Sequence, residues 1–465
     1  MSNAPKEVVD LHGHRYPLSA TASPKSGGQG TVFEVEGGKL AVKILINRTS
    51  AQRERLKNQI TFVKRLPLQD VAIAKPLAVL RSPYLGYVME LMSGMVPLKT
   101  LAAVPKGTPS LVRWYFSGGG LKRRLRLLAK SADILAKLHS KGLVYGDPSP
   151  ANIFVSESVD AQEVAFIDAD NLTYSSSPVA QTIYTPSYGA PELLKGLSGV
   201  NSLTDAHAFS VLAFQTLTLA HPLIGDYVTE GEPCLEEKAL LGELPWIEHE
   251  GDNLNRCHSG IPREMVLSPE LRKLCRRSFE EGLNEPTKRP GIAEWAERLH
   301  ASADRTLNCP SCGGSYYYNE AHCPWCDHQR PTFVRIIFYL WDPSLGEGKE
   351  VLERPDKKPV IAEIAIMDEQ VPLRIDSRLA FGSTPGSHCR ELVELSLSGD
   401  VLSLKSLDGA SYCLISASRT KQMDLGLRPV TTKLEPRKSS LYLHLGDKAE
   451  VHRVVRFEFH PGGPS

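Results

Sequence analysis

The sequence predicts a multidomain α+β protein whose C-terminal part is all-β. From about residue 12 to 304, strand-like runs alternate with runs of helical period, whereas after about residue 331 the helical period disappears. A segment rich in cysteine, glycine and tyrosine lies between these regions. Because a domain averages about 100–200 residues, the 465 residues suffice for roughly two to four domains. We therefore expect a tail (1–11), a first domain (12–304), a cysteine-rich segment (305–330) and a β-domain (331–465).

Composition narrows the function classes. The 54 Lys and Arg residues balance 53 Asp and Glu residues, which argues against nucleic acid as the main partner. No stretch approaches about 18–20 uncharged apolar residues and the N-terminus has no apolar signal core, so we expect neither a membrane partner nor export. Four of the nine cysteines form two CxxC pairs, which is typical of a reducing, cytoplasmic setting rather than of a disulfide framework.

The first domain begins with strands. Residues 16–46 predict three antiparallel strands, two of them joined by a Gly-Gly turn. Residues 50–66 predict a helix capped by Ser50. A long helix begins near residue 121, where leucines and alanines recur at three- and four-residue steps.

A glycine-rich segment, Lys25–Val32, lies between the first strands. Glycines allow backbone N–H groups to approach phosphate oxygens closely, although many such clusters are only turns. Lys43 alternates with apolar residues on the next strand but one, which by itself is typical of an exposed position. Together the two features indicate a lysine that points at the phosphates of a nucleotide.

Three polar residues follow the long helix. Asp147 and Asn152 lie five residues apart before an apolar strand, and Asp168 ends the next apolar strand. An aspartate so placed accepts a proton from an incoming hydroxyl group, while the asparagine and the second aspartate hold a metal ion on the phosphates. A turn built from Asp, Asn, Ser and Pro is the alternative for the first pair.

In this order, the motifs resemble the protein kinase fold, specifically the eukaryotic-type (Hanks-type) serine/threonine kinases of bacteria, over residues 12–304. The resemblance implies an N-lobe at about 12–90 and a C-lobe at about 91–304, with ATP and Mg²⁺ (or Mn²⁺) as cofactors. It assigns catalysis to Lys43, Asp147, Asn152 and Asp168, and the magnesium to Asn152 and Asp168. It assigns nucleotide binding to the glycine-rich loop, the third strand and the hinge: Gly27, Gly28, Gly30, Val32, Ala41, Lys43, Met89, Glu90 and Met92.

The same resemblance extends beyond the catalytic residues. The segment Thr185–Glu192 matches the family's T-P-x-Y-x-A-P-E pattern, which closes the activation loop. Asp205 falls where a central helix braces the catalytic loop, and Arg289 is implied as the partner of Glu192.

The sequence departs from the family's pattern at positions that affect mechanism. Lys25 replaces the first loop glycine. Gly146 replaces the arginine before the catalytic aspartate, so we expect no strict need for a phosphate on the activation loop. Ser149 replaces the lysine that steadies the γ-phosphate, which removes a positive charge from the transition state.

Two roles stay open. Asp170 stands where the family has glycine, as either a second metal ligand or a polar turn residue. The helix over residues 50–66 offers two partners for Lys43: Gln59, which the apolar register favours, and Glu54, its only acidic residue.

Two functions follow from this pattern. A serine/threonine protein kinase that phosphorylates proteins, itself included, is favoured because the groups needed for phosphoryl transfer are all present. The alternative is a nucleotide-binding pseudokinase or scaffold that recruits partners through the cysteine-rich segment and the β-domain.

The cysteine-rich segment predicts a structural zinc ribbon. Cys309 and Cys312, and then Cys323 and Cys326, form two CxxC knuckles separated by ten residues. Four thiolates close a tetrahedron around Zn²⁺ and leave no open position for catalysis. A pair of disulfides is the alternative, which a reducing setting disfavours.

The β-domain predicts a sandwich. Gly, Pro, Ser and Asp separate its strand runs, which are 333–341, 360–366, 439–445 and 454–459. The domain contains no recognisable catalytic set, so a protein-interaction role is the default. A weak resemblance to forkhead-associated modules, which read phosphothreonine, rests on Arg378–Ser383, Ser387 and His388.

The order of kinase, zinc ribbon and β-domain, with the insertion Gly242–Trp246, resembles the bacterial kinases linked to tellurium-resistance and stress operons. That resemblance implies a role in stress signalling. It also implies two partners, a von Willebrand factor A-type protein and a metal-dependent protein phosphatase.

Overall fold

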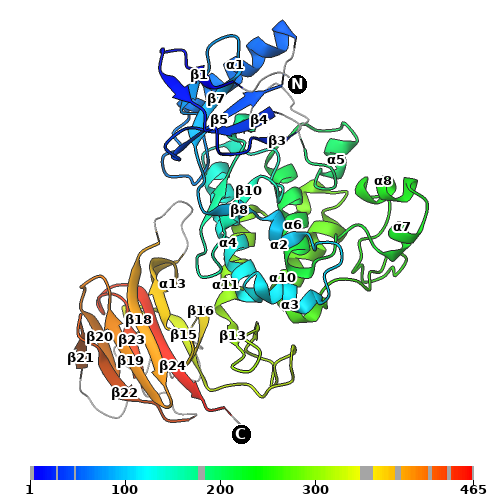
Figure 1. Cartoon of the computed structure of the whole chain (residues 1–465). Helices are drawn as coiled ribbons and strands as arrows, with labels where there is room; N and C mark the ends of the chain where they lie inside the picture. Colours follow the sequence, from blue (N-terminus) through cyan, green and yellow to red (C-terminus); the bar gives the residue numbers. More distant parts are fainter. Residues whose placement is uncertain are drawn as a thin grey trace. The chain divides into compact units, whose positions relative to one another are not determined.

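The computed structural model of the chain describes residues 5–27, 30–46, 49–175, 184–345, 360–382, 389–416, 422–436 and 441–462. The chain divides into two compact units (Figure 1). The first unit comprises Met1–Leu111, Lys130–Ile261 and Arg272–Ala296, and the second comprises Val112–Ala129, Pro262–Leu271 and Glu297–Ser465. Within the described ranges, every helix is too short or too polar to cross a membrane.

A five-stranded antiparallel sheet, blue in Figure 1, lies in the N-terminal part of the first unit. Helix α1 (Ser50–Arg65) packs on one face of this sheet, where Ile60 joins a buried cluster with Ala41 and Tyr87. The strand expected near residue 16 instead pairs in a separate two-stranded sheet, β1 (Glu7–Val9) with β2 (Arg15–Pro17). The order of the five strands is β3 (Lys25–Gly27), β4 (Gly30–Glu34), β5 (Leu40–Leu45), β7 (Gly86–Glu90) and β6 (Ala78–Val79).

The cap of α1 differs from the expected one. Thr49, rather than Ser50, precedes the helix, and its side chain accepts a hydrogen bond from Gln52 N while the Gln52 side chain accepts from Thr49 N. This reciprocal pair satisfies two backbone donors at the start of the helix, which a serine one residue later cannot do.

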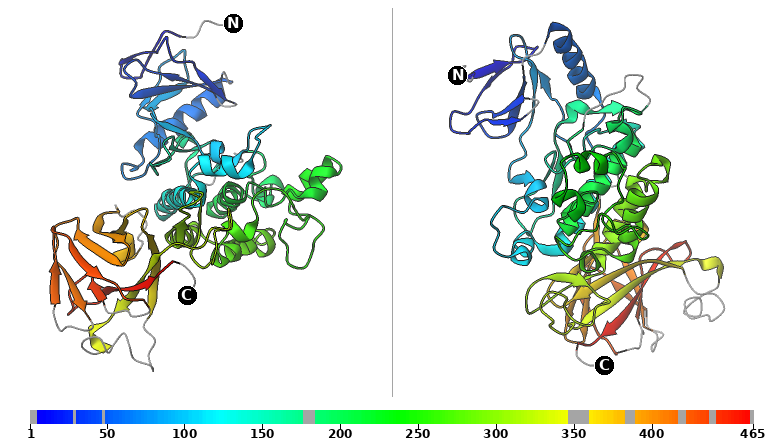
Figure 2. Two further views of the ribbon diagram at one scale, coloured as in Figure 1. Left: turned by 60° about the horizontal axis from the view of Figure 1, so that its bottom comes forward. Right: turned by 90° about the vertical axis from the view of Figure 1, so that its right-hand side faces the viewer.

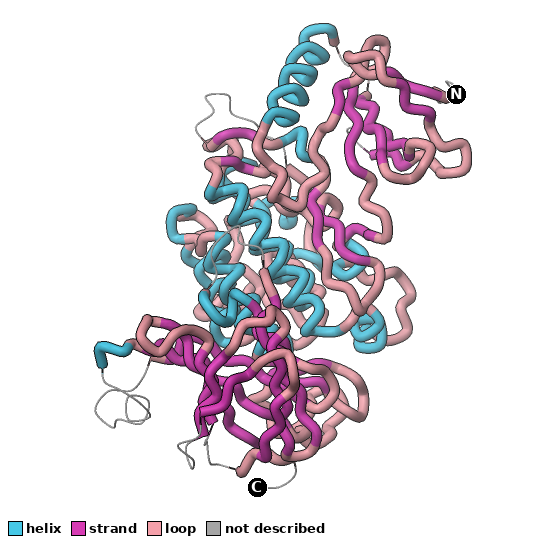
Figure 3. The backbone as a smooth tube through the Cα atoms, turned by 90° about the vertical axis from the view of Figure 1, so that its left-hand side faces the viewer, coloured by secondary structure: helices cyan, strands magenta, loops and turns pink. Residues whose placement is uncertain are grey.

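Helices predominate between residues 99 and 304, a stretch that contributes to both units, and Figure 3 distinguishes them from the strands. The expected long helix is α4 (Gly120–Ser140), whose repeating leucines are buried. Helix α6 (Ser202–Thr218) is buried along almost its whole length, as a central helix must be. The other helices between residues 99 and 304 are α2 (Lys99–Ala102), α3 (Leu111–Ser117), α5 (Pro191–Leu194), α7 (Asp226–Glu230), α8 (Cys234–Leu240), α9 (Arg263–Val266), α10 (Pro269–Arg276) and α11 (Ile292–Asp304), with the short helical turns η1 (Ala169–Asn171), η2 (Arg277–Glu281) and η3 (Pro286–Lys288).

Short strands carry the loops of the candidate site. They are β8 (Met95–Pro97), β10 (Ile153–Ser156) and β11 (Val164–Phe166) in one sheet, and β9 (Leu143–Val144) with β12 (Thr173–Tyr174) in another. Pairing of β10 with β11 brings the chain near residue 152 beside the chain near residue 168.

Two antiparallel sheets, yellow to red in Figure 2, form the β-domain of the second unit. One buried cluster takes residues from both sheets, including Phe338 on β15 and Leu404 on β19, so the sheets pack face to face. The six-stranded sheet has the order β16 (Ile361–Asp368), β15 (Phe333–Trp341), β24 (His452–His460), β23 (Leu441–His444), β20 (Tyr412–Ser416) and β21 (Gln422–Leu425). The four-stranded sheet has the order β17 (Leu373–Asp376), β18 (Glu391–Ser398), β19 (Val401–Ser406) and β22 (Val430–Lys433). The second unit also contains helix α13 (Ser377–Phe381), the turn η4 (Pro343–Leu345) and the hairpin of β13 (Thr306–Asn308) and β14 (Ser315–Tyr317).

Two histidines are buried together in the β-domain. His452 Nδ1 donates to Glu450 O over 2.8 Å, and its Nε2 shares a hydrogen bond of 2.8 Å with His444 Nδ1. Only one of the two facing nitrogens can carry a hydrogen, so this bond is incompatible with protonation of both rings. Burial, with the neighbouring His452 and Lys448, lowers the pKa of His444 from 6.5 to about 4, and burial also lowers the pKa of His452.

We therefore expect the β-domain to lose stability as the pH falls from 6.5 towards 4. In this range the unfolded histidines bind protons that the folded pair excludes, and His444 alone contributes a loss of about 3 kcal/mol by pH 4. Chemical denaturation of wild type and His444→Gln at pH 7.5 and 4.5 measures this effect, with the exposed His12→Gln as control. Identical pH dependence in all three proteins would contradict the assignment.

Candidate functional site

Lys43 lies on the central strand of the five-stranded sheet. Strand β5 pairs with both β4 and β7, so Lys43 has Val32 and Tyr87 as its two register neighbours. The Lys43 side chain is 4% exposed. A buried ammonium group requires negatively charged or hydrogen-bonding partners, because burial removes its hydration.

Two carboxylates supply that partnership. Lys43 Nζ lies 3.0 Å from Asp168 Oδ1 and 3.2 Å from Asp170 Oδ1. Asp168 adopts a left-handed backbone conformation (φ 54°) after β11 and begins the turn η1, which presents both aspartates to the lysine. Burial alone disfavours the charged form of Lys43, but the charges of Asp170 and Asp168 outweigh it and raise its pKa. Burial also raises the pKa of Asp168, although Lys43 opposes that shift.

The open question about the helix partner has an unexpected answer. Gln59 donates from Nε2 to the main-chain oxygens of Asp170 (3.2 Å) and Leu172 (2.7 Å), and Glu54 is exposed on α1. The Asp170 side chain, in contrast, pairs with Lys43 and accepts a hydrogen bond from Tyr87 Oη over 2.7 Å. Asp170 is therefore more than a polar turn residue.

Asp147 lies in the loop between β9 and β10. Its Oδ1 accepts from Thr185 N (2.8 Å), and its Oδ2 accepts from Thr185 Oγ1 (2.9 Å) and Asn152 Nδ2 (2.9 Å). Burial raises the pKa of Asp147, against the lowering effect of these hydrogen bonds. A carboxylate has about four acceptor positions, so one position on Oδ1 is left for another donor.

A buried carboxylate on α6 braces this loop. Asp205 accepts hydrogen bonds from Tyr145 N (2.9 Å) and Gly146 N (2.8 Å), and His139 Nε2 lies 2.9 Å from the same group. Gly146 has a φ of 87°, a left-handed backbone conformation that glycine adopts without strain. The two residues before Asp147 therefore have their backbone N–H groups fixed by Asp205.

The two halves of the site are also joined directly. Ile167 N donates to Asn152 O over 3.0 Å, and Tyr145 Oη donates to Ile167 O over 2.5 Å. The charge of Asp147 acts on Asp168 and helps to raise its pKa. Lys43, Asp147, Asn152 and Asp168 therefore belong to one connected group, although they span more than a hundred residues of sequence.

The glycine-rich loop lies at the end of the same sheet. Gly27 pairs with Gly30 across β3 and β4. A Cβ on Gly30 would lie 2.4 Å from Ile44 O, so only glycine fits there. Gly28 lies outside the described residues.

Four of the residues assigned to nucleotide binding share one apolar cluster. Ala41 and Met89 are buried in it, and Val32 and Met92 pack against it while remaining partly exposed. Ile167, at the end of β11, joins them and was not among the predicted residues. Glu90 ends β7 with its side chain exposed.

Glu192 and Arg289 form a bidentate ion pair in the first unit. The Arg289 guanidinium donates to both Glu192 oxygens at 2.7 and 2.8 Å and to Gly282 O at 2.7 Å, and its side chain is fully buried. We expect Arg289→Leu to lower the free energy of unfolding by about 3–5 kcal/mol, because it removes both hydrogen bonds to the largely buried Glu192 carboxylate, which is 13% exposed, and leaves it unpaired. Urea denaturation measures the change. The exposed Arg298→Ala is the control, and equal stability of both variants would contradict the expectation.

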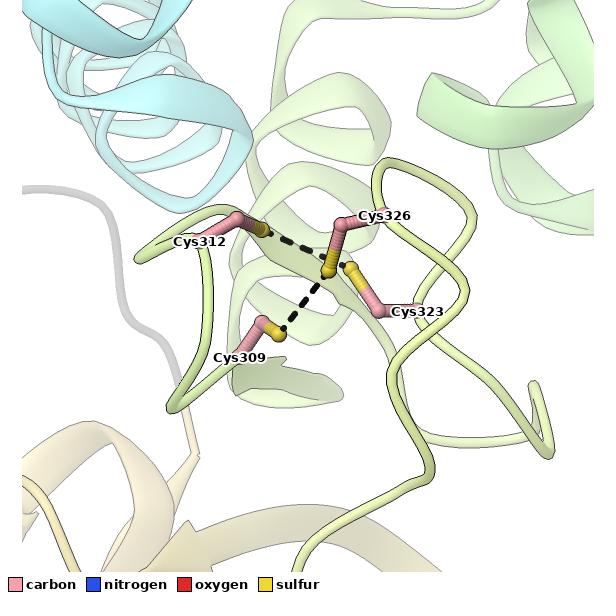
Figure 4. Close-up of side chains that lie close together, drawn as sticks. All are labelled: Cys309, Cys312, Cys323 and Cys326. Atoms are coloured by element: carbon pink, nitrogen blue, oxygen red, sulfur yellow. Dashed lines mark hydrogen bonds between the residues drawn. The ribbon is translucent and has the colours of Figure 1, made fainter.

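The four cysteines of the zinc prediction converge, with their sulfurs pointing towards one another (Figure 4). All four sulfurs lie within 4.8 Å of one another, with 3.6 Å between Cys309 and Cys326 and 3.7 Å between Cys312 and Cys323. Tetrahedral Zn²⁺ with Zn–S bonds of about 2.3 Å requires sulfurs about 3.8 Å apart. A hydrogen bond with the His328 backbone leads the effects that lower the pKa of Cys326 to about 7, which favours its thiolate. The donor set therefore fits zinc.

The cysteine-rich segment is packed against helices of the second unit. The Trp325 ring meets Phe116 edge-on, with 5.2 Å between ring centroids. Trp325 Nε1 donates to Ser315 O (3.0 Å), and Ser315 Oγ accepts from Lys122 N (2.8 Å) in the first turn of α4. The metal site and the start of α4 are thus structurally connected.

The residues behind the forkhead-associated resemblance are differently placed. The Arg378 side chain is only 10% exposed and pairs with the fully buried Asp304 at 2.6 Å. Its guanidinium is thus largely buried and engaged by Asp304, a carboxylate that it shares with Arg126. Ser383, Ser387 and His388 lie outside the described residues.

The sequence placed Tyr87 in the segment that resembles the family's gatekeeper and hinge, and Thr185 in the activation-loop motif. It did not predict the hydrogen bonds of Tyr87 to Asp170 or of Thr185 to Asp147, and it left the role of Asp170 open. The sequence did contain a signal for Asp170, because it departs from the kinase pattern at two positions together. An aspartate, Asp170, stands where that pattern has glycine, and an uncharged residue, Gln59, stands where it has an acidic partner for the lysine. Thr185 lay within a recognised motif, but its contact with Asp147 depends on how the chain folds back.

Comparison with known proteins finds bacterial relatives. The serine/threonine-protein kinase pkn2 of Myxococcus xanthus is 28% identical over 223 residues, 43% of this chain and 24% of that protein. PknB of Mycobacterium tuberculosis is 30% identical over 200 residues, 41% of this chain and 31% of that protein. The DNA damage-responsive serine/threonine-protein kinase RqkA of Deinococcus radiodurans is 24% identical over 222 residues, 46% of this chain and 31% of that protein.

These matches cover part of each sequence. The chain spans about a quarter to a third of the length of these curated relatives. No family model matches the chain. Over less than half its length, the chain is therefore similar to bacterial serine/threonine-protein kinases.

Proposed function

We propose that the chain is an ATP-dependent serine/threonine protein kinase, with a two-lobed kinase fold over residues 12–304. It transfers the γ-phosphoryl group of Mg-ATP to protein hydroxyl groups, its own included. The observation that carries this proposal is the connected group of a buried lysine paired with Asp168 and a buried Asp147 bonded to Asn152.

The residues fit a magnesium-bound nucleotide. Carboxylate and amide oxygens are the protein ligands that Mg²⁺ and Mn²⁺ prefer, and Asp168 and Asn152 offer them. The Asn152 amide nitrogen is engaged by Asp147, which leaves its Oδ1 free of that bond. A metal ion held by Asp168 and Asn152 would neutralise charge on the phosphoryl oxygens, and Lys43 would add a fixed positive charge.

Asp147 has a geometry suited to a substrate hydroxyl. Thr185 and Asn152 fix the plane of the carboxylate, and one acceptor position on Oδ1 is left over. A serine or threonine hydroxyl donating to that position would be oriented for attack and would give up its proton there.

The second candidate is a nucleotide-binding pseudokinase or scaffold. It is favoured by Ser149, which is buried where the family has a lysine. A catalytic site without that charge stabilises the transition state less. In this case the zinc ribbon and β-domain would recruit partners without phosphoryl transfer.

The wider setting is part of the proposal. We assign protein substrates, a structural Zn²⁺ at the four cysteines, and a cytoplasmic stress-signalling role. The proposed partners are a von Willebrand factor A-type protein and a metal-dependent phosphatase. These assignments rest on the cysteine pattern and on the resemblances of domain order.

Transfer of radiolabelled phosphate from ATP tests the proposal. Wild type is expected to label itself or casein with Mg²⁺ or Mn²⁺ present, whereas Asp168→Asn is expected to lose the labelling. The exposed Asp160→Asn serves as control. Nucleotide-dependent thermal stabilisation without labelling would favour the pseudokinase, and the absence of both would favour the scaffold.

A further inference from the structure

Lys43 is held by a carboxylate that the family resemblance does not assign to it. We propose that Asp170 is the positioning residue for Lys43 and that Tyr87 fixes the Asp170 carboxylate, so that the nucleotide-binding lysine is anchored without an acidic residue from α1. The inference rests on the proposed function, because that function gives Lys43 the task of binding phosphates.

Three buried side chains make this anchor. Asp170 Oδ1 lies 3.2 Å from Lys43 Nζ and accepts the Tyr87 hydroxyl over 2.7 Å. Lys43, Tyr87 and Asp170 are 3%, 0% and 7% exposed, so water competes little for these bonds. Tyr87 and Lys43 are register neighbours on β7 and β5, which fixes the spacing of the two donors.

The protonation of Tyr87 supports the same arrangement. Burial, together with the charge of Asp170, raises the pKa of Tyr87 well above its usual value. The hydroxyl therefore keeps the proton that it donates to Asp170. The ring of Tyr87 also lies below Lys43, with Nζ 5.9 Å from the ring centroid.

Asp168 and Asp170 divide two tasks between them. The Asp168 side chain is 20% exposed and the Asp170 side chain 6% exposed. Two donors already satisfy Asp170 Oδ1, which makes that oxygen a poor metal ligand. When Asp168 turns to a metal ion, Asp170 still holds Lys43.

Helix α1 contacts the same turn through an uncharged side chain, that of Gln59. Gln59 donates to the main-chain oxygens of Asp170 and Leu172, which ties α1 to η1 and the residue after it. An amide cannot act as the counter-ion of Lys43. The lysine and the helix are thus separately attached to residues 170–172.

Binding of ADP, measured by calorimetry on the full chain, tests the proposal without requiring transfer activity. Loss of the charged partner leaves Lys43 misplaced, so we expect Asp170→Asn to raise the Kd for Mg-ADP about 10–100-fold. Tyr87→Phe should produce a smaller increase, about threefold to tenfold, because it removes one neutral hydrogen bond. Glu54→Gln, on the exposed face of α1, should bind as wild type does.

Two further readouts separate positioning from other roles. With EDTA present, the weakening by Asp170→Asn should persist, because Lys43 contacts phosphate with or without metal. If the weakening disappears without metal, Asp170 is a metal ligand, and if only the binding stoichiometry falls, its role is structural. Either result, or an unchanged Kd for Mg-ADP, would overturn the proposal.

The same data keep this inference distinct from the kinase proposal. If wild type binds Mg-ADP and Asp170→Asn weakens it, the inference stands even when no phosphate is transferred. If wild type transfers phosphate and Asp170→Asn binds Mg-ADP normally, the kinase proposal stands and the inference fails. If wild type does not bind Mg-ADP, both fail.

Discussion

Replacing Asp147 with asparagine is expected to slow phosphoryl transfer about 10²–10⁴-fold. The amide keeps the size of the side chain but cannot accept the proton of a substrate hydroxyl. Binding of Mg-ADP should change little, because Lys43, Asn152 and Asp168 are unaltered. Initial rates at saturating Mg-ATP measure the loss, and ADP calorimetry measures the binding.

A matched control accompanies this prediction. Asp160→Asn makes the same chemical change at an exposed position between β10 and β11, and it should retain the wild-type rate. An Asp147→Asn protein that keeps more than a tenth of the wild-type rate would contradict the role given to Asp147. A protein that loses Mg-ADP binding as well would place Asp147 in nucleotide binding.

Loss of zinc should lower the stability of the second unit. Structural zinc in small peptides contributes about 10–16 kcal/mol of apparent binding energy, which is largely folding energy. If ~3 kcal/mol of this is coupled to folding of the second unit, Cys312→Ser or a strong chelator should lower the unfolding midpoint by about 6–12 °C. Calorimetry and elemental analysis measure both quantities on the full chain.

The contacts of the cysteine-rich segment explain why loss of zinc should destabilise the neighbouring helices as well. Trp325 rests on Phe116, and Ser315 accepts a backbone hydrogen bond from α4, so collapse of the knuckles exposes an aromatic contact and frees a helix donor. Cys234→Ser, at an exposed cysteine outside the cluster, should retain both zinc and stability. Zinc content that is unchanged in Cys312→Ser would contradict the four-thiolate assignment.

Elements with a strong hydrophobic period were predictable from the sequence. The run 333–341 is strand β15 itself, and the long helix begins at Gly120, one residue from its expected start. The spacing of apolar residues in such a segment predicts its secondary structure, because one face of the segment must be buried. The cap of α1 at Thr49 was not predicted, since Ser50 offers the same chemistry and only the observed hydrogen bonds distinguish them.

The proximity of Asp147 and Asn152 could be predicted from the sequence, because both residues lie in one local motif. The bond between Lys43 and Asp170 joins residues 127 positions apart, and no local pattern encodes it. Tyr87 looked like any aromatic residue of a buried strand, because its hydroxyl partner is supplied by a distant turn. Tertiary contacts of this kind follow from the fold rather than from spacing.

The central claim is that Lys43, Asn152 and Asp168 surround one metal-bound nucleotide. A crystal structure with Mn²⁺ and a non-hydrolysable ATP analogue, with the metal located by its anomalous scattering, tests it most directly. We expect an anomalous peak within bonding distance of Asp168 and Asn152, with Lys43 contacting the phosphates. Nucleotide bound elsewhere, or a manganese ion remote from both side chains, would contradict the claim.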